Sequence, residues 1–253
     1  MVDPKSKPVP PAAAEDARLR EKVRLRFRKE GDLRFVSHHD LLRCFERALR
    51  RAEIPFARTQ GFNPHPRIVF ALSLPLGVVG CEEIADVELK PGTLEEMPPE
   101  AMLACLNRES PPGLSVLALW PVERKASLKI RSFCYRIAIP EQRLPAVRAR
   151  LQELTSAEQW PVDRVKPKKN PPPNASAEES VIRTRIDVRP FVKDIRIVQD
   201  VVEMDLWLTP QGTARPGELL QLLNVHDLHE KGAMLERSRL VLEETSREPD
   251  NIE

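Results

Sequence analysis

The sequence predicts an α+β protein in which two ferredoxin-like α/β sandwich units, each with an antiparallel sheet, follow one another in tandem. The first observation is an order of strand, helix, strand pair, helix and strand between residues 22 and 120. The second is that a similar order recurs between residues 131 and 243. The third is one amphipathic helix in each half, at 41–52 and at 144–154, whose apolar residues recur at helical spacing.

Composition places the boundaries of these units. Residues 1–19 are rich in Pro, Ala and Lys without periodicity, and we expect them, like residues 246–253, to form a tail. The first unit is then expected to span 20–122 and the second 123–245, with the join near Pro121 to Leu128. Residues 166–180, rich in Pro, Lys, Ser and Glu, predict an exposed insertion in the second unit.

The first unit begins with a predicted strand in which Val23, Leu25 and Phe27 alternate with three arginines. This alternation predicts one buried face and an outer face that carries Arg24, Arg26 and Arg28. A further strand is predicted at 67–74, with 83–89 pairing back on it. A helix at 94–108, interrupted early by two prolines, and a strand at 114–120 complete the unit.

The central element of this unit is a predicted helix that starts at Ser37. Ser37 is a favoured N-cap residue, and Asp40 lies three residues on, as in a capping box with Asp in place of Glu. The helix is expected to end at Ala52 or Glu53, because the residue before Pro55 is pushed out of the α region.

The second unit is predicted from the same kinds of pattern. Its expected elements are a strand at 131–139, a helix at 141–156, strands at 160–165, 181–188 and 201–208, a helix at 215–223 and a strand at 238–243. The segment after Leu223, which carries His226 and His229, is expected to be a loop.

The overall charge says little about partners. The 253 residues include 40 Lys and Arg against 38 Asp and Glu, a net charge of +2. No run of 18 or more apolar residues and no signal peptide is found, so we expect a cytoplasmic protein without a membrane partner.

The basic residues are nevertheless concentrated in one part of the chain. Between Arg18 and Arg67 there are 14 Lys and Arg against six acids, an excess of eight. Arg43, Arg47 and Arg50 stand four and three residues apart, which predicts a basic stripe on one face of the helix. Two interpretations stay open: a surface that binds a polyanion such as RNA, or strand and helix faces that are charged only because water covers them.

The loop from Gly61 to Pro66 is the second candidate for function. Gly61 permits a positive φ, while Pro64 and Pro66 restrict the backbone on both sides of His65. His38 and His65, with Asp40 nearby, could transfer protons or bind a metal. The alternative is that His38 assists the N-cap and His65 hydrogen-bonds within its loop. We expect no metal site, because no complete set of ligands has the necessary spacing.

The four cysteines, Cys44, Cys81, Cys105 and Cys134, are scattered singly along the chain. None forms a Cys-x-x-Cys pair or the three-cysteine motif that holds the cluster of a radical SAM domain. We therefore expect no iron–sulfur cluster and no other cofactor in this chain.

Several short motifs, concentrated in residues 22–90, resemble one bacterial family. They are Phe27-Arg28-Lys29, Leu33-Arg34-Phe35, Ser37-His38, Asp40, Glu46 to Ala52, Gly61 to Pro66 and Leu74-Pro75-Leu76-Gly77. These residues resemble the radical-SAM-linked protein family, a bacterial domain of unknown function found fused to, or encoded beside, B12-type radical SAM proteins. The resemblance is weaker at 186–190 and 212–223. It implies a separately encoded radical SAM protein as partner, and no particular reaction.

Two functions of different classes follow. In the first, the chain is a non-catalytic binding or adaptor module that presents an RNA or a ribosome-related substrate to a separate radical SAM enzyme. In the second, it is a small metal-independent endoribonuclease that uses His38 or His65 in a basic cleft, an idea that rests on analogy of fold. The residues expected to bind are Arg24, Arg26, Arg28, Ser37, His38, Asp40, Arg43, Arg47, Arg50, Gly61, Phe62, Asn63, His65 and Arg67.

Overall fold

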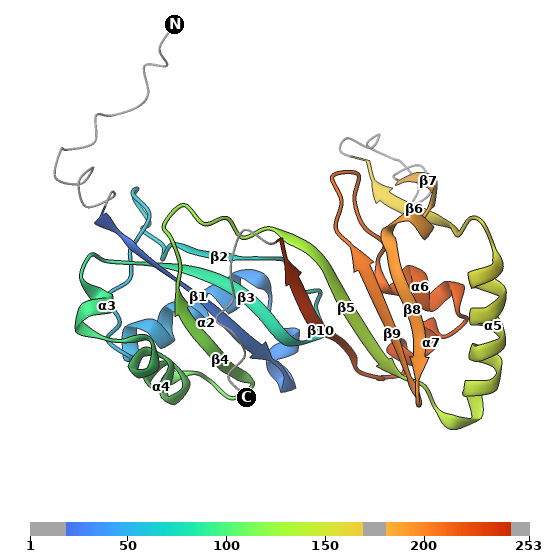
Figure 1. The fold of residues 1–253 in the computed structure, drawn as a ribbon, viewed down its shortest axis with the longest axis horizontal. Coiled ribbons are helices and arrows are strands. Elements are labelled where there is room, and N and C mark those ends of the chain that lie inside the picture. The colour runs from blue at the N-terminus through green and yellow to red at the C-terminus, as the bar shows by residue number, and fades with distance from the viewer. Residues whose placement is uncertain (1–18, 169–180, 244–253) are drawn as a thin grey trace, which may run out of the picture. The chain divides into compact units, whose positions relative to one another are not determined.

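The computed structural model describes residues 19–168 and 181–243. The predicted tails, apart from Leu19, and most of the predicted insertion at 166–180 lie outside the described residues. The fold is a mixed α/β fold with helices and a large, mostly antiparallel sheet (Figure 1). Contacts divide it into two compact units: one holds the residues up to Ile130 together with those from Arg237 on, and the other holds Arg131–Glu236.

The strands of the first unit lie in the order β4-β1-β3-β10, with the short β2 pairing on β3. Antiparallel pairs join β1 to both β3 and β4, so β1 is a central strand. The elements of this unit are β1 (Glu21–Lys29), the 3₁₀ helix η1 (Gly31–Phe35), α2 (His38–Arg51), β2 (Ile68–Phe70), β3 (Val79–Leu89), α3 (Thr93–Glu96), α4 (Pro99–Glu109), β4 (Leu114–Pro121) and β10 (Leu235–Leu242).

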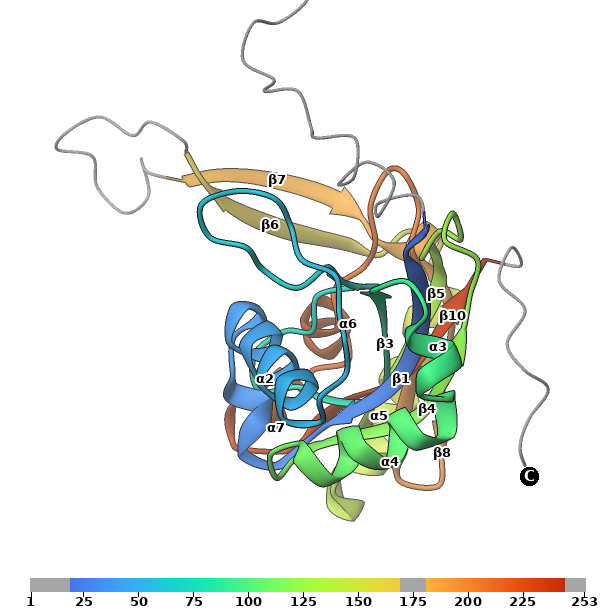
Figure 2. The same ribbon diagram turned by 90° about the vertical axis from the view of Figure 1, so that its left-hand side faces the viewer.

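Two helices cover one face of this sheet, as the turned view in Figure 2 shows for α2 and α4. Phe27 of β1 packs edge-on against Phe45 of α2, with ring centroids 5.0 Å apart, and against Phe70 of β2 at 5.8 Å. Met102 and Leu106 bring α4 into the same core. The apolar face of the 41–52 helix thus packs on this sheet.

The second unit has the strand order β5-β9-β8, all antiparallel, and a separate two-stranded sheet of β6 and β7. Its elements are β5 (Ile130–Ala138), η2 (Glu141–Arg143), α5 (Leu144–Ser156), β6 (Pro161–Pro167), β7 (Val181–Asp187), η3 (Arg189–Phe191), β8 (Val192–Val198), β9 (Val201–Trp207), α6 (Pro216–Leu222) and α7 (His226–Glu230). The sequence did not predict β8, because its pattern is too polar, or α7, which replaces an expected loop.

The last strand differs from expectation in where it belongs. The residues predicted at 238–243 lie in β10, and those from Arg237 on group with the first unit rather than closing the second. The coarser prediction, a mixed α/β fold on antiparallel sheet, is confirmed. The arrangement of two ferredoxin-like units in tandem stays a prediction.

A buried ion pair explains both the position of this strand and the shortness of β2. Arg237 and Glu83 are 1% and 4% exposed at their side chains, and Arg237 Nε donates to Glu83 Oε1 at 2.8 Å. The same guanidinium donates to the carbonyl oxygens of Leu72 and Ser73, at 3.0 and 3.1 Å. Because these carbonyls bind the arginine, the strand predicted at 67–74 is regular only over Ile68–Phe70.

Replacing Arg237 with Met is expected to lower the free energy of unfolding by about 3–5 kcal/mol, since Glu83 would be left buried without its partner. Urea unfolding followed by circular dichroism measures the change. Arg43→Met is the matched control, because it removes an exposed pair with Asp40 and should cost about 0–1 kcal/mol. Equal losses for the two variants would contradict the role given to Arg237.

Candidate functional site

The arginines of β1 do not form the open basic face that their alternation predicts. Arg24 is 0% exposed, and its Nε and Nη2 atoms donate to the two carboxylate oxygens of Asp86 at 2.7 and 3.0 Å. Residues 126 and 127 cross this face of the strand, where Ser127 O accepts a further bond from Arg24 at 3.3 Å. The prediction of an exposed Arg24 is wrong, because the segment after β4 covers it.

The other two β1 arginines are half-buried in ion pairs of their own. Arg26 Nη1 lies 3.3 Å from Glu82, and Arg28 Nε lies 2.8 Å from Glu30. Their charges are therefore largely balanced within the protein. The face of β1 is therefore a network of ion pairs within the protein.

The start of α2 is built as the sequence predicts. Ser37 is the N-cap, and its hydroxyl oxygen accepts a hydrogen bond from the Asp40 backbone N–H at 3.2 Å. The Ser37 hydroxyl also donates to the Asp40 carboxylate at 2.7 Å, and Arg43 donates to that carboxylate at 3.1 Å. The bond from Ser37, followed by the charge of Arg43, lowers the pKa of Asp40. Both side chains are thus engaged in capping the helix.

The structure does not bring His38 and His65 together. His38 is exposed and packs edge-on against Phe70, with ring centroids 5.0 Å apart. His65 is also exposed, and its hydrogen bonds are made by its backbone, with Thr59. No hydrogen bond, ion pair or ring contact among the described residues links His65 to His38 or Asp40. The hypothesis of one site that combines these three residues is therefore without structural support.

The arginine stripe on α2 is exposed, in agreement with the prediction from its spacing. Arg43 pairs with Asp40 at 3.1 Å, and Arg50 pairs with Glu46 at 2.5 Å. Arg47 forms no ion pair with any residue that the structure describes. Its guanidinium is the most available of the three for a ligand.

Arg58 connects this stripe to the loop that follows α2. Its Nη2 lies 3.9 Å from Glu46 on the helix, and its carbonyl oxygen accepts a hydrogen bond from Arg67 Nε at 3.3 Å. Arg67 also lies 3.7 Å from Glu88. Sequence reasoning missed the role of Arg58, although the residue belongs to the basic segment that the charge count identified.

The loop itself has a narrow neck and an exposed tip. Thr59 N donates to His65 O at 2.8 Å, and His65 N donates to Thr59 Oγ1 at 3.0 Å. The backbones of Arg58 and Pro66 form an isolated antiparallel β-bridge. Gly61 has φ +142°, a conformation that favours glycine, and Phe62 at the tip is fully exposed. Asn63 beside it is exposed as well. In Figure 2 this cyan segment projects beyond α2.

We call the exposed part of this region the α2–loop surface, and it consists of Arg43, Arg47, Arg50, Arg58, Phe62, His65 and Arg67. It combines guanidinium groups, which form hydrogen bonds to phosphates, with one fully exposed aromatic ring, that of Phe62. Such a surface can bind an anionic ligand and stack on a flat group.

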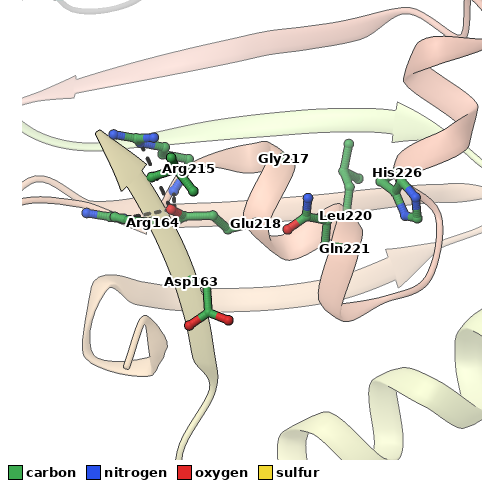
Figure 3. Close-up of a pocket in the computed structure, with 9 residues that line it drawn as sticks. Asp163, Arg164, Arg215, Gly217, Glu218, Leu220, Gln221 and His226 are labelled. Carbon is green, nitrogen blue, oxygen red and sulfur yellow. Dashed lines mark hydrogen bonds and ion pairs between the residues drawn. The ribbon is translucent and has the colours of Figure 1, made fainter. Parts of the chain in front are cut away.

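The second unit carries an open cavity of about 420 Å³ (Figure 3). It lies among β6, α6 and α7, and its lining includes Asp163, Arg164, Arg215, Glu218 and His226. Arg164 is bound to both oxygens of Glu218, at 2.7 and 2.9 Å, and Glu218 also accepts a bond from the Arg215 backbone. The main charges of the cavity are therefore used to join β6 to α6. A smaller cavity of about 230 Å³ lies beside Trp160 and Arg189.

Across residues 19–168 and 181–243, no group of three or more His, Cys, Asp or Glu side chains is placed to hold a metal ion. The four cysteines are free thiols, and burial raises the pKa of Cys44. A buried thiol with a raised pKa is a poor nucleophile at neutral pH.

Replacing Ser37 with Ala is expected to raise the pKa of Asp40 toward its ordinary value of 3.8, because the hydroxyl bond that holds it down is lost. Because its pKa is lowered, the Asp40 carboxylate stabilises the folded state at pH values above the ordinary pKa. This stabilisation is lost as the pH falls through the lowered pKa. The pKa is measured by NMR titration of the Asp40 carboxyl carbon. Arg47→Gln is the control, and an Asp40 pKa that does not respond to Ser37→Ala would disprove the assignment.

Comparisons with known proteins give one match to a family model and no informative match to a curated protein or a solved structure. Within the described residues, no helix is both long and apolar enough to cross a bilayer. No curated protein matches the chain. An unknown protein from Galdieria sulphuraria, known from a crystal structure, aligns with a TM-score of 0.27 at 11% identity, over 88% of this chain and 99% of that one, a likeness too low to carry an argument. The model of a family described as an uncharacterized protein conserved in bacteria (DUF2344) matches residues 22–216, and the chain belongs to this family.

Proposed function

We propose that this protein is a non-catalytic binding module that holds single-stranded RNA on the α2–loop surface and presents it to a separate enzyme. The observation that carries the proposal is Phe62, an aromatic side chain that is fully exposed at the tip of a loop with a braced neck. An aromatic ring held out in solvent next to guanidinium groups is suited to stack on an unpaired base while the arginines contact phosphates.

The braced loop makes such contact less costly. Thr59 and His65 close the neck through two hydrogen bonds, and Pro64 and Pro66 limit the backbone on either side of His65. A loop that is already ordered loses less conformational entropy when it binds. The tip is therefore prepared for a ligand without a large rearrangement.

Charge on the α2–loop surface favours weak, salt-sensitive binding. Its five arginines lie among three acids that contact them, Asp40, Glu46 and Glu88. The net charge of the α2–loop surface and these acids therefore remains positive, but it is small. Phosphate contacts of this kind fall off as salt rises, so stacking on Phe62 has to supply much of the affinity.

The partner in this proposal is a radical SAM enzyme encoded separately, with an RNA or a ribosome-related molecule as the substrate. This part rests on the resemblance of the motifs around Ser37, Gly61 and Leu74 to the radical-SAM-linked family. The scattered cysteines of this chain agree with an iron–sulfur cluster that is held by another polypeptide.

The endoribonuclease alternative has less support. General acid–base cleavage needs a histidine placed with a second titrating or charged group. The side chain of His38 lies against Phe70, and His65 bonds through its backbone. No observation favours the alternative, and it stays a prediction whose test is metal-independent cleavage of RNA by the isolated protein.

Phe62→Ala is expected to weaken binding of a fluorescein-labelled oligouridine of about 12 nucleotides roughly tenfold, because one stacking contact is lost. Fluorescence anisotropy measures the affinity, and Phe62→Trp should retain it. Phe35→Ala is the matched control, since Phe35 is an exposed phenylalanine outside the α2–loop surface. The proposal fails if the two alanine variants bind alike.

Replacing Arg43, Arg47 and Arg50 together with Glu should also weaken oligouridine binding and flatten its dependence on salt between about 50 and 200 mM. The fold should persist because all three side chains are exposed, and the melting temperature checks this. If the parent protein does not bind at the lowest salt, the stripe is only a solvated face.

A further inference from the structure

The second unit contains a two-stranded ribbon, formed by β6 and β7, that the proposed function does not use. The strands pair antiparallel from Pro161 opposite Asp187 to Pro167 opposite Val181. No third strand joins this sheet among the residues that the structure describes. A two-stranded ribbon without further packing is only marginally stable in water, so what holds it in place matters.

The ribbon is anchored at one end only. Asp187 accepts the Trp160 N–H at 2.7 Å, and buried Trp160 donates its ring N–H to Leu154 O at 2.7 Å. Further along, Arg164 binds Glu218 through two hydrogen bonds and Thr213 O at 2.6 Å (Figure 3). These bonds tie the first half of the ribbon to α5 and α6.

Beyond Arg164 the side chains are exposed on both faces of the ribbon. Directly opposed residues of an antiparallel pair share a face, so Lys166 and Ile182 lie on one face while Val165 and Arg183 lie on the other. All four are exposed, and so is Lys168 next to them. Thr184, opposite Arg164, and Arg185, opposite Asp163, are exposed nearer the anchored end. Among the residues that the structure describes, the side chains of this half are exposed, which leaves them open to a partner.

The exposed charges of the ribbon are mostly positive. Among the residues that the structure describes, Lys166, Lys168 and Arg185 form no ion pair, in contrast to the arginines of β1 and to Arg196 on β8. Asp163, directly across from Arg185, is the acid on the exposed face. Lys166 and Lys168 are therefore exposed cations without an acidic partner among the described residues, whereas Arg185 has Asp163 across from it.

We propose that the β6–β7 ribbon binds the phosphate backbone of double-stranded RNA. The inference rests on the proposed function in taking RNA as the ligand, but it uses different residues and a different form of RNA. The described residues of the ribbon include no aromatic side chain, so it lacks the means to stack on unpaired bases. Its cations are suited to phosphates, and duplex RNA is bound mainly through its shape and backbone.

A protein strand added to the ribbon edge is the less favoured occupant. Strand addition requires a row of unpaired backbone N–H and C=O groups. Pro161 and Pro167 lack the N–H at both ends of β6, and lysines along an edge strand oppose such pairing. The same lysines favour a polyanion.

The test uses the full chain and two labelled probes: an RNA hairpin with a stem of about 16 base pairs and a short loop, and the oligouridine of about 12 nucleotides. Lys166→Glu/Lys168→Glu/Arg185→Glu should lower affinity for the hairpin at least about tenfold at roughly 100 mM salt. It should reduce the slope of log affinity against log salt by about two to three. Oligouridine binding should change much less.

Lys90→Glu/Lys125→Glu/Lys129→Glu is the matched control, because it changes the net charge equally at exposed lysines of the first unit. Equal loss of hairpin affinity in the two triple variants, or tighter binding of the parent to a DNA duplex of the same sequence, would overturn the inference. So would a parent that does not bind the hairpin. Binding of the hairpin without binding of oligouridine would instead refute the proposed function and leave the ribbon inference standing.

Discussion

The buried ion pair between Glu83 and Arg237 is the constraint on which the first unit depends most. It joins residues 154 positions apart in the chain and leaves both side chains almost inaccessible to water. A carboxylate in such a place needs its partner, since an unpaired buried charge is strongly destabilising. The backbone accommodates the pair: a Cβ at Gly80 would lie 2.5 Å from Glu83 Cγ, so glycine leaves the carboxylate the space it occupies. The position of β10, the end of β2 and the choice of Gly80 all follow from this one contact.

Local sequence signals were enough to predict α2 and a helix at 94–108 interrupted by prolines, because capping, periodicity and proline act over a few residues. The structure divides the second of these at the prolines into α3 and α4. Local signals failed where a distant residue decides the local structure. The strand after Pro66 is short because the guanidinium of Arg237 binds the carbonyls of Leu72 and Ser73. Arg24 is buried because residues 126 and 127 lie across its strand. An alternating pattern identifies the two faces of a strand, but it does not show whether a later segment covers the polar one.

For the candidate site too, the sequence predicted the features that depend on neighbouring residues and missed those that depend on distant ones. Spacing identified the arginine stripe, and the glycine and prolines identified the loop with Phe62 and His65. What the sequence could not show is that Arg58 approaches Glu46 across the neck of the loop, which makes one surface out of helix and loop. It also suggested a shared site for His38 and His65, because both belong to the same set of motifs, whereas their contacts are with Phe70 and Thr59. Proximity in a motif is weak evidence for proximity in space.

Basic side chains in this protein fall into two groups that composition cannot separate. In the first group, the three arginines of β1 and Arg237 of β10 are buried or half-buried and each has a carboxylate partner, so they contribute to the fold. Those on α2 and on the distal half of the β6–β7 ribbon are exposed, and several have no ionic partner among the described residues. A net charge of +2 hides this division, because the total counts buried, paired and exposed charges alike. For a polyanion the relevant quantity is the local, unpaired charge, and only the folded structure shows where that charge remains.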